Sequence, residues 1–406
     1  MTSMSALPRV AARMGMAAML VGVCAAPAIG QSIKVGGKEI DFHGSLQQGF
    51  NVTDENNFLT MDTTKGSGAM TDAAFNVTTN LTPKFRVGAQ AYLRNIGELG
   101  NGHLEVDWAF ADYKFTDAFG VRGGKMKTML GLYTDTQDME FLYTWALLPQ
   151  GMYPLDLRSV TIAHVGGDVY GAVKLAKAGT FQYTGYYGVL QDDNQGGYRY
   201  GIQDAGINFR STVRSKGGGL DARWMTPVNG LLAGYSFNQT RLDADLVYKP
   251  AGAPVGVNFV ANTYPWRRNS VYADYQVSRV HFSSEYRREL RDSVVTPALF
   301  PRSAVYSTSW FAAGSYRVGK HLELGSYYSH YVYNNAVAAS LANNHIYDKV
   351  VSARVDVTNW WNVKVEGHFV DGTGNPTFTH GFYRRSNPGG FKPTTNMLVI
   401  RTGVNF

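Results

Sequence analysis

The chain ends on the segment Leu398-Val-Ile-Arg-Thr-Gly-Val-Asn-Phe406, in which side-chain character alternates almost without a break. In an extended strand, one face would carry Leu398, Ile400, Thr402, Val404 and Phe406, and the opposite face Val399, Arg401, Gly403 and Asn405. A strand with one largely apolar face and an arginine on the other suits a wall between lipid and water. The segment therefore predicts the last strand of a sheet that lies in a membrane.

The same alternation recurs along the chain. It is clearest in five segments: Phe85 to Leu93, Leu104 to Phe110, Val165 to Leu175, Val271 to Val277 and Trp361 to Phe369. In Leu104 to Phe110, the pattern places Leu104, Val106, Trp108 and Phe110 on one face. Repeated strands of ~10 residues predict an all-β fold, a closed antiparallel transmembrane β-barrel of about 16 strands. The stretch from Asp192 to Met225 is ambiguous, because it could hide or lose one hairpin.

The connections between these strands alternate in length. Tight turns are predicted at Thr82 to Lys84, Thr116 to Ala118, Lys177 to Gly179, Val228 to Gly230, Gly319 to Lys320 and Thr358 to Asn359. Longer polar connections are predicted at Asn51 to Met70, Leu130 to Ile162, Asp192 to Gly218, Pro250 to Pro265, Arg291 to Tyr306, Asn334 to His345 and Asp371 to Pro393. This alternation places short turns on one rim and long loops on the other, with both chain ends on the short-turn rim, as in bacterial outer-membrane barrels.

Composition supports a two-faced barrel over a soluble β-sandwich or a helical membrane protein. Charged residues make up 17% of the chain, against ~25% in a typical soluble domain. No segment after residue 30 holds the 18 or so consecutive apolar residues of a membrane-spanning helix. Aromatic pairs such as Tyr186-Tyr187 and Trp360-Trp361 fall near strand ends, as expected for interfacial belts.

The first 30 residues are predicted to be a signal peptide. Arg9 and Arg13 precede an apolar run from Met14 to Val23, and small residues follow. Cleavage is expected before Gln31, or alternatively after Ala28. The remaining domain, residues 31–406, then lacks cysteine, and its formal charge falls from +7 to +5 with the loss of two arginines. Basic residues occur at most in pairs, so a nucleic-acid partner is not indicated.

The connection that begins near Leu130 differs from the other loops in being apolar and aromatic. It holds Phe141, Leu142, Tyr143, Trp145, Leu147 and Leu148. These side chains would be costly to leave in water, so the loop is expected to fold back against the barrel wall.

The mature chain resembles the Gram-negative outer-membrane porins. The resemblance is carried by Val121 to Tyr153, with Arg122, Gly124, Lys125, Lys127, Gly131-Leu132-Tyr133 and Pro149-Gln150, and by the terminal Phe406. Members of that superfamily are 16-stranded homotrimers whose third loop folds inward and narrows the pore. The Pro-Glu-Phe-Gly-Gly signature of the enteric loop is absent here.

The resemblance implies acids on the loop that face basic side chains across the lumen. The candidate acids are Asp135, Asp138 and Glu140, and the candidate bases are Arg86, Arg94, Arg122, Lys125 and Lys127. Strand parity prevents Arg122 and Lys125 from both facing inward unless a bulge intervenes.

These observations favour a passive channel in the bacterial outer membrane. Its expected partners are membrane lipid and small hydrophilic solutes or ions, and its net charge predicts a weak anion preference. No metal, cofactor or catalytic residue is predicted, since histidines are scattered and His281 with Ser283 is an ordinary same-face pair. Two alternatives stay open: a solute-selective channel for anions or sugars and, with less support, a barrel hydrolase.

Overall fold

A computed structural model describes residues 31–249, 255–375, 377 and 380–406. The predicted signal peptide, residues 1–30, lies outside these described residues, as does the part of the predicted 250–265 loop at 250–254. Among the described residues, no helix is both long and apolar enough to cross a membrane.

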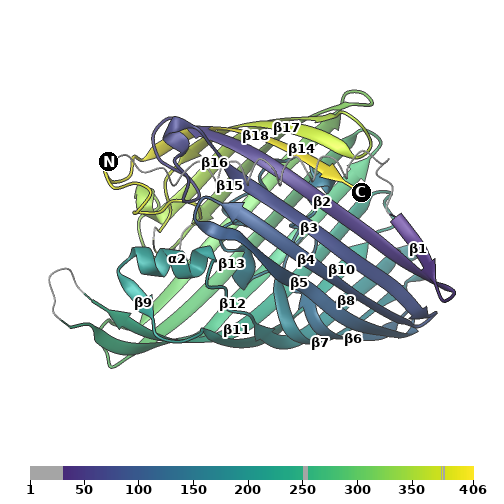
Figure 1. Ribbon diagram of the computed structural model, residues 1–406, viewed down its shortest axis with the longest axis horizontal. Coiled ribbons are helices and arrows are strands. Elements are labelled where there is room, and N and C mark those ends of the chain that lie inside the picture. The colour runs from purple at the N-terminus through teal and green to yellow at the C-terminus, as the bar shows by residue number, and fades with distance from the viewer. Residues whose placement is uncertain (1–30, 250–254, 376, 378–379) are drawn as a thin grey trace, which may run out of the picture.

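Strands dominate the structure (Figure 1). They are β1 (Gln31–Val35), β2 (Lys38–Thr53), β3 (Ser67–Thr82), β4 (Phe85–Ile96), β5 (Leu99–Thr116), β6 (Phe119–Lys127), β7 (Ala163–Lys174), β8 (Thr180–Leu190), β9 (Ile207–Phe209), β10 (Arg214–Met225), β11 (Leu231–Tyr248), β12 (Val257–Val277), β13 (Val280–Thr296), β14 (Ser303–Arg317), β15 (Leu322–Val332), β16 (His345–Asp356), β17 (Trp361–Asp371) and β18 (Thr394–Asn405). The helix α2 spans Gly197–Asp204, and 3-10 turns lie at Thr63–Lys65, Glu140–Leu142, Arg158–Val160, Ala176–Ala178 and Ala342–Asn344.

Sixteen of these strands form a closed antiparallel barrel, which confirms the predicted fold and strand number. Each strand from β2 to β8 and from β10 to β18 pairs with its neighbour in sequence, β8 pairs directly with β10, and β18 pairs with β2. The two remaining strands are additions, because β1 forms a hairpin with β2 and β9 lies against the end of β11. The ambiguous 192–225 stretch therefore contains α2, β9 and one barrel strand, with no additional hairpin in the wall.

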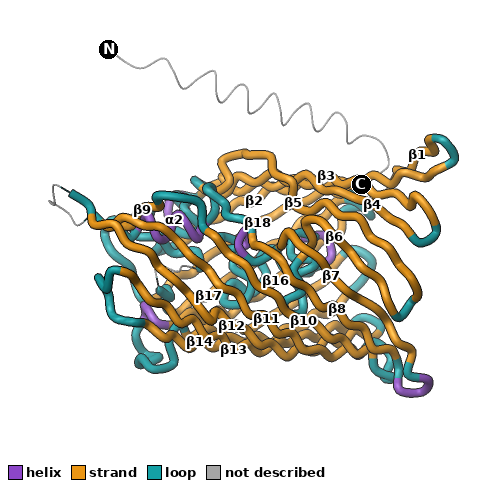
Figure 2. The backbone as a smooth tube through the Cα atoms, turned by 90° about the horizontal axis from the view of Figure 1, so that it is seen from below, coloured by secondary structure: helices purple, strands orange, loops and turns teal. Residues whose placement is uncertain are grey.

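Short and long connections segregate to opposite rims, as predicted (Figures 1 and 2). The rim with the predicted tight turns also holds the C-terminus, where Phe406 and Gly44 exchange backbone hydrogen bonds of 2.9 Å. We call this end the short-turn rim and the other the long-loop rim. One connection on the long-loop rim is tight, because only Gly97 and Glu98 separate β4 from β5.

The barrel is apolar outside and polar inside. In β18, Leu398 and Ile400 on the outer face are 41% and 37% exposed, whereas the inward Arg401 is 3% exposed. In β5, however, the predicted face is wrong beyond Val106. Gln90 pairs with Trp108 and Ala91 with Val106, so the intervening Asp107 is a bulge that turns Trp108 and Phe110 to the inner face.

Candidate pore constriction

The connection between β6 and β7, residues 128–162, lies inside the barrel. Its backbone N–H groups donate to inward side chains on distant strands: Gly131 to Ser236 Oγ at 2.9 Å, Leu132 to Glu285 Oε2 at 3.0 Å and Leu147 to Glu366 Oε2 at 3.0 Å. These acceptors belong to β11, β13 and β17. The predicted inward fold of this loop is therefore confirmed, and we call residues 128–162 the constriction loop.

Aromatic packing fixes the loop against the wall. Trp145 is 4% exposed and meets Tyr327 of β15 edge-on, with ring centroids 5.1 Å apart. Gly325 leaves the space for that indole, since a Cβ there would come within 2.8 Å of two of its ring carbons. Tyr143, Leu147 and Leu148 are also buried, as expected.

Leu142 departs from the expected burial of the aromatic segment. Its side chain is 51% exposed, and Phe141 is only half-buried. The reason is that backbone carbonyls of this turn bond the wall, with Arg354 Nη1 donating to Phe141 O at 2.7 Å and to Tyr143 O at 2.9 Å. The arginine holds the main chain of the turn and leaves the Leu142 side chain exposed.

Each predicted loop acid meets a basic side chain. Asp135 receives two 3.2 Å hydrogen bonds from the Arg223 guanidinium of β10. Asp138 lies 2.7 Å from Lys127 Nζ and 3.4 Å from Arg158 Nη2, and Lys127 also contacts Asp107 at 2.9 Å. Asp135 thus pairs with a base of the wall, and Asp138 pairs with one base of the wall and one of the loop itself.

Glu140 is at the centre of a buried charge cluster that links the loop to three strands. Its carboxylate is 3.3 Å from Lys364 Nζ of β17 and forms an ion pair with Arg401 of β18. Arg401 also pairs with Asp72 of β3 and donates to the Ala146 carbonyl at 3.0 Å. Burial raises the pKa of the Glu140 carboxyl above its ordinary value of 4.5, although Arg401 and Lys364 oppose this.

Arg158, in the second half of the loop, is fully buried beside Asp107 at 2.8 Å, with its guanidinium 4.0 Å from the centre of the Tyr92 ring. Burial disfavours its charge, but Asp107 and Asp138 outweigh burial and hold the pKa of Arg158 above its ordinary value. Through these two acids, Arg158 links the loop to the wall by charge-assisted contacts.

Of the five predicted bases, the structure joins only Lys127 to a loop acid. Arg94 is 2% exposed and pairs with Asp193 of the 191–213 connection. Arg122 lies 3.6 Å from Asp168 and over the Tyr170 ring, and Arg86 lies over Phe110 at 5.9 Å. Both therefore face the lumen between the constriction loop and the short-turn rim.

Lys125 lies on the other parity from Arg122, as the parity argument required. It is in register with the outward Val165, and its Nζ donates to the Val106 carbonyl at 2.5 Å.

Sequence reasoning missed four bases on other strands of the wall: Arg223, Arg354, Lys364 and Arg401. Alternation could have identified all four as inward-facing. What it could not supply was the path of the loop across the lumen, which selects these partners.

The His281–Ser283 pair is divided between other partners. His281 Nε2 lies 2.6 Å from Asp274, while Ser283 Oγ receives the Tyr133 hydroxyl of the loop at 2.7 Å. Within the part of the chain that the structure describes, no group of three or more His, Cys, Asp or Glu side chains is arranged to hold a metal.

Comparisons with known proteins identify the fold. No protein-family model and no curated protein sequence matches this chain. Among solved structures, OmpT, an outer membrane protein of Vibrio cholerae, matches with a TM-score of 0.60 at 14% identity, covering 93% of this chain and 100% of that chain. The chain has the fold of a porin-type outer-membrane barrel.

Other matches agree. OmpF of Salmonella typhi, in a complex with daunomycin, gives a TM-score of 0.56 at 12% identity over 93% of this chain and all of its own. The anion-selective porin of Comamonas acidovorans gives 0.53 at 11% identity over 91% of this chain and all of its own. The named neighbours are outer-membrane proteins, and a large barrel with an apolar outer face belongs in that membrane.

Proposed function

We propose that this protein is a porin, which forms a water-filled channel for passive diffusion of small hydrophilic solutes across the outer membrane. The observation that carries the proposal is the constriction loop: it crosses the lumen and sets acids against basic residues of the wall. Charged side chains that stay accessible along a narrow passage orient water and dipolar solutes and disfavour large apolar ones.

Charges on the inner face remain accessible to water. Arg86 is exposed although it shares the inner face with Gln90 and Arg94, and the side chains of Arg122 and Asp135 keep 28% and 27% exposure. A lumen open to water near the short-turn rim accounts for this exposure. We expect these accessible charges to tune selectivity, and the buried Arg94 to contribute little.

The net charge of residues 31–406 supports a weak anion preference. That preference should weaken as salt rises, because the Debye length is ~8 Å at physiological ionic strength. The acids and bases at the constriction are paired, so they leave little net electrostatic potential there. The accessible arginines between the constriction and the short-turn rim would therefore contribute most of the anion preference.

Planar-bilayer recording tests the proposal. Wild-type protein should give ohmic steps and a reversal potential on the anion side in a salt gradient. The double variant Arg86→Gln, Arg122→Gln should move that potential toward cations. A matched control removes two outward-facing cations, Arg288→Gln with Lys349→Gln, and should leave it unchanged. A barrel that conducts no ions in any salt would overturn the porin proposal.

We further propose cleavage of residues 1–30 on export and assembly into a homotrimer. The trimer proposal is supported by a gap in the wall. The first half of β5, from Leu99 to the residue before Ala109, has no partner on β6, because the chain turns into the lumen soon after the Ala109–Lys125 pair. Leu104 and Val106 beside this gap are 64% and 55% exposed in the single chain. A strand edge without a partner exposes backbone hydrogen-bonding groups, and a second subunit can cover them.

Sedimentation of the detergent-solubilised protein tests the trimer. The wild type should sediment as a trimer, and Leu104→Arg should dissociate it. A monomeric wild type would contradict the proposal.

A further inference from the structure

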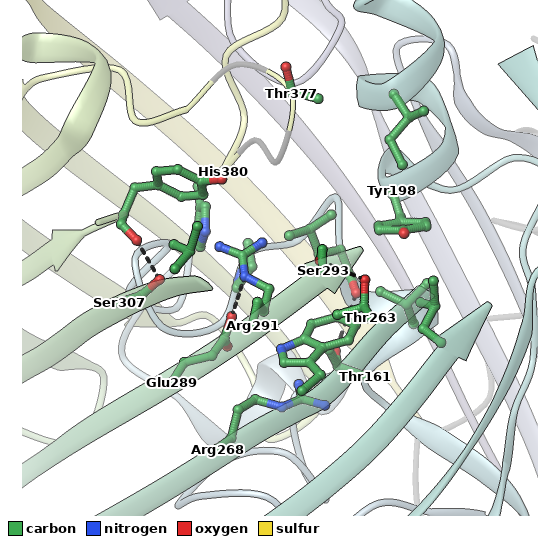
Figure 3. Close-up of a pocket in the computed structure, with 18 of the residues that line it drawn as sticks. Thr161, Tyr198, Thr263, Arg268, Glu289, Arg291, Ser293, Ser307, Thr377 and His380 are labelled. Atoms are coloured by element: carbon green, nitrogen blue, oxygen red, sulfur yellow. Dashed lines mark hydrogen bonds and ion pairs between the residues drawn. The ribbon is translucent and has the colours of Figure 1, made fainter. Parts of the chain in front are cut away.

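We propose that a cavity on the long-loop side of the constriction loop binds small monocarboxylates that carry an apolar body. The cavity measures about 270 Å3 and lies between the constriction loop, α2 and the inner faces of β11 to β14 (Figure 3). The proposal deepens the channel function proposed above, because it names a preferred class of solute and the place where it would bind.

Three arginines line one side of this cavity, on neighbouring strands: Arg268 of β12, and Arg287 and Arg291 of β13. Two of them are neutralised by acids of their own strand. Arg287 lies 2.9 Å from Glu285, and Arg291 lies 2.9 Å from Glu289. Figure 3 shows the Arg291–Glu289 pair above Arg268, with Tyr198 of α2 across the cavity.

Arg268 is different. It is 3% exposed, yet it has no carboxylate within 4.0 Å among the described residues. Its Nη2 donates to the neutral Asn238 side chain at 3.0 Å, its guanidinium carbon lies 4.7 Å from the centre of the Trp266 ring, and its Nε has no hydrogen-bond partner. The facing Glu289, its partner in strand register, is engaged by Arg291.

A buried cation without a counter-ion is costly, and a ligand that supplies the missing negative charge removes that cost. A carboxylate fits best, because it can accept two parallel hydrogen bonds from one guanidinium. A second negative charge on the ligand would lie near Glu289, which also lines the cavity, and this disfavours dianions.

Most of the remaining lining surface is apolar, although Ser, Thr, Gln and His side chains also contribute to it. Leu242 and Leu246 of β11 and Phe259 of β12 are each 4% exposed and turn inward, and Tyr198 and Ile202 of α2 lie among the lining residues. This predominantly apolar surface favours a ligand whose body is an aryl or alkyl group. A cavity of 150 Å3 holds benzene. The larger volume here therefore admits a phenyl ring with a short acidic chain.

Calorimetric titration of the refolded barrel with phenylacetate tests the inference. Wild type should bind phenylacetate at least ten times more tightly than acetate, which lacks the ring, or 2-phenylethanol, which lacks the charge. Arg268→Gln should weaken phenylacetate binding at least tenfold. The outward-facing control Arg288→Gln loses the same charge and should bind as wild type.

A second variant keeps the inference testable if Arg268→Gln does not fold. Leu246→Asn should reduce the preference for phenylacetate over acetate while Arg268 is intact. Equal binding by wild type and Arg268→Gln, or equal binding of phenylacetate and 2-phenylethanol, would overturn the assignment. Ion conductance without phenylacetate binding would refute this site alone, whereas phenylacetate binding by a barrel that conducts no ions would refute the channel and leave the site.

Discussion

Replacing Arg401 with methionine should loosen the constriction loop by a large and measurable factor. The Arg401 side chain is 4% exposed and compensates both Asp72 and Glu140. Without it, Glu140 keeps Lys364 at 3.3 Å, but Asp72 has no other cation within 4.0 Å among the described residues. Breaking a buried ion pair in this way costs about 3–5 kcal/mol.

That cost destabilises the state in which the constriction loop is docked against the wall, because undocking of the loop lets water reach Asp72. With about 1.4 kcal/mol for each tenfold change, the population of the unseated loop should rise by roughly two to four powers of ten. Ser352→Cys is a suitable reporter, since Ser352 is 6% exposed and its hydroxyl bonds the loop carbonyl of Thr144 at 3.2 Å. Residues 31–406 contain no native cysteine, so a thiol reagent would report this position alone.

We expect the labelling rate of Ser352→Cys to rise by that factor in the Arg401→Met background while the barrel stays folded by circular dichroism. Adding Asp72→Asn should return the rate to within about tenfold of the parent, because the stranded carboxylate is gone. A rate unchanged by Arg401→Met would refute the claim that this cluster seats the loop.

Three further predictions follow from the same geometry. Gly325→Val should displace the Trp145 ring, since even a Cβ would approach its carbons to 2.8 Å, and should raise single-channel conductance; a wild-type step size would argue against Trp145 as a seat for the loop. Acidification should increase anion preference early, because the raised pKa of Glu140 lets it lose its charge above the usual range and leaves Lys364 and Arg401 less compensated; Glu140→Gln should abolish this early shift in reversal potential, and a shift that persists would assign it elsewhere. Gly44→Val should slow barrel assembly in refolding assays, because a Cβ at Gly44 would lie 2.3 Å from the Phe406 ring, and refolding at the parental rate would contradict that reading.

The sequence predicts those features that depend on local alternation. The outward Leu398 and inward Arg401 follow from a period of two, and the tight turns follow from Gly, Asn and Pro. Alternation fails at Trp108 because one extra residue, Asp107, bulges from β5 and reverses every later side chain. Nothing in the segment itself marks that position.

The candidate site is predicted only in part for a different reason. The acids Asp135, Asp138 and Glu140 are evident from the loop. Arg223 is 88 residues from its partner Asp135, and Lys364 and Arg401 are 224 and 261 residues from their partner Glu140. Only the partners of Asp138, Lys127 and Arg158, are near in sequence. Which inward base meets which acid depends on how the loop crosses the lumen, and its aromatic contacts with β14 and β15 decide that course.

The cluster of Glu140, Arg401 and Asp72 also bears on the order in which the barrel is made. Arg401 lies on the last strand, which joins β2 to complete the cylinder, and Asp72 lies on β3 just beyond that seam. Until the final strand docks, neither acid can pair with Arg401, and all three charged groups stay in contact with water. Pairing of β18 with β2 and docking of the constriction loop are therefore coupled. The lumen of a folding barrel should stay open and hydrated until its last strand has paired.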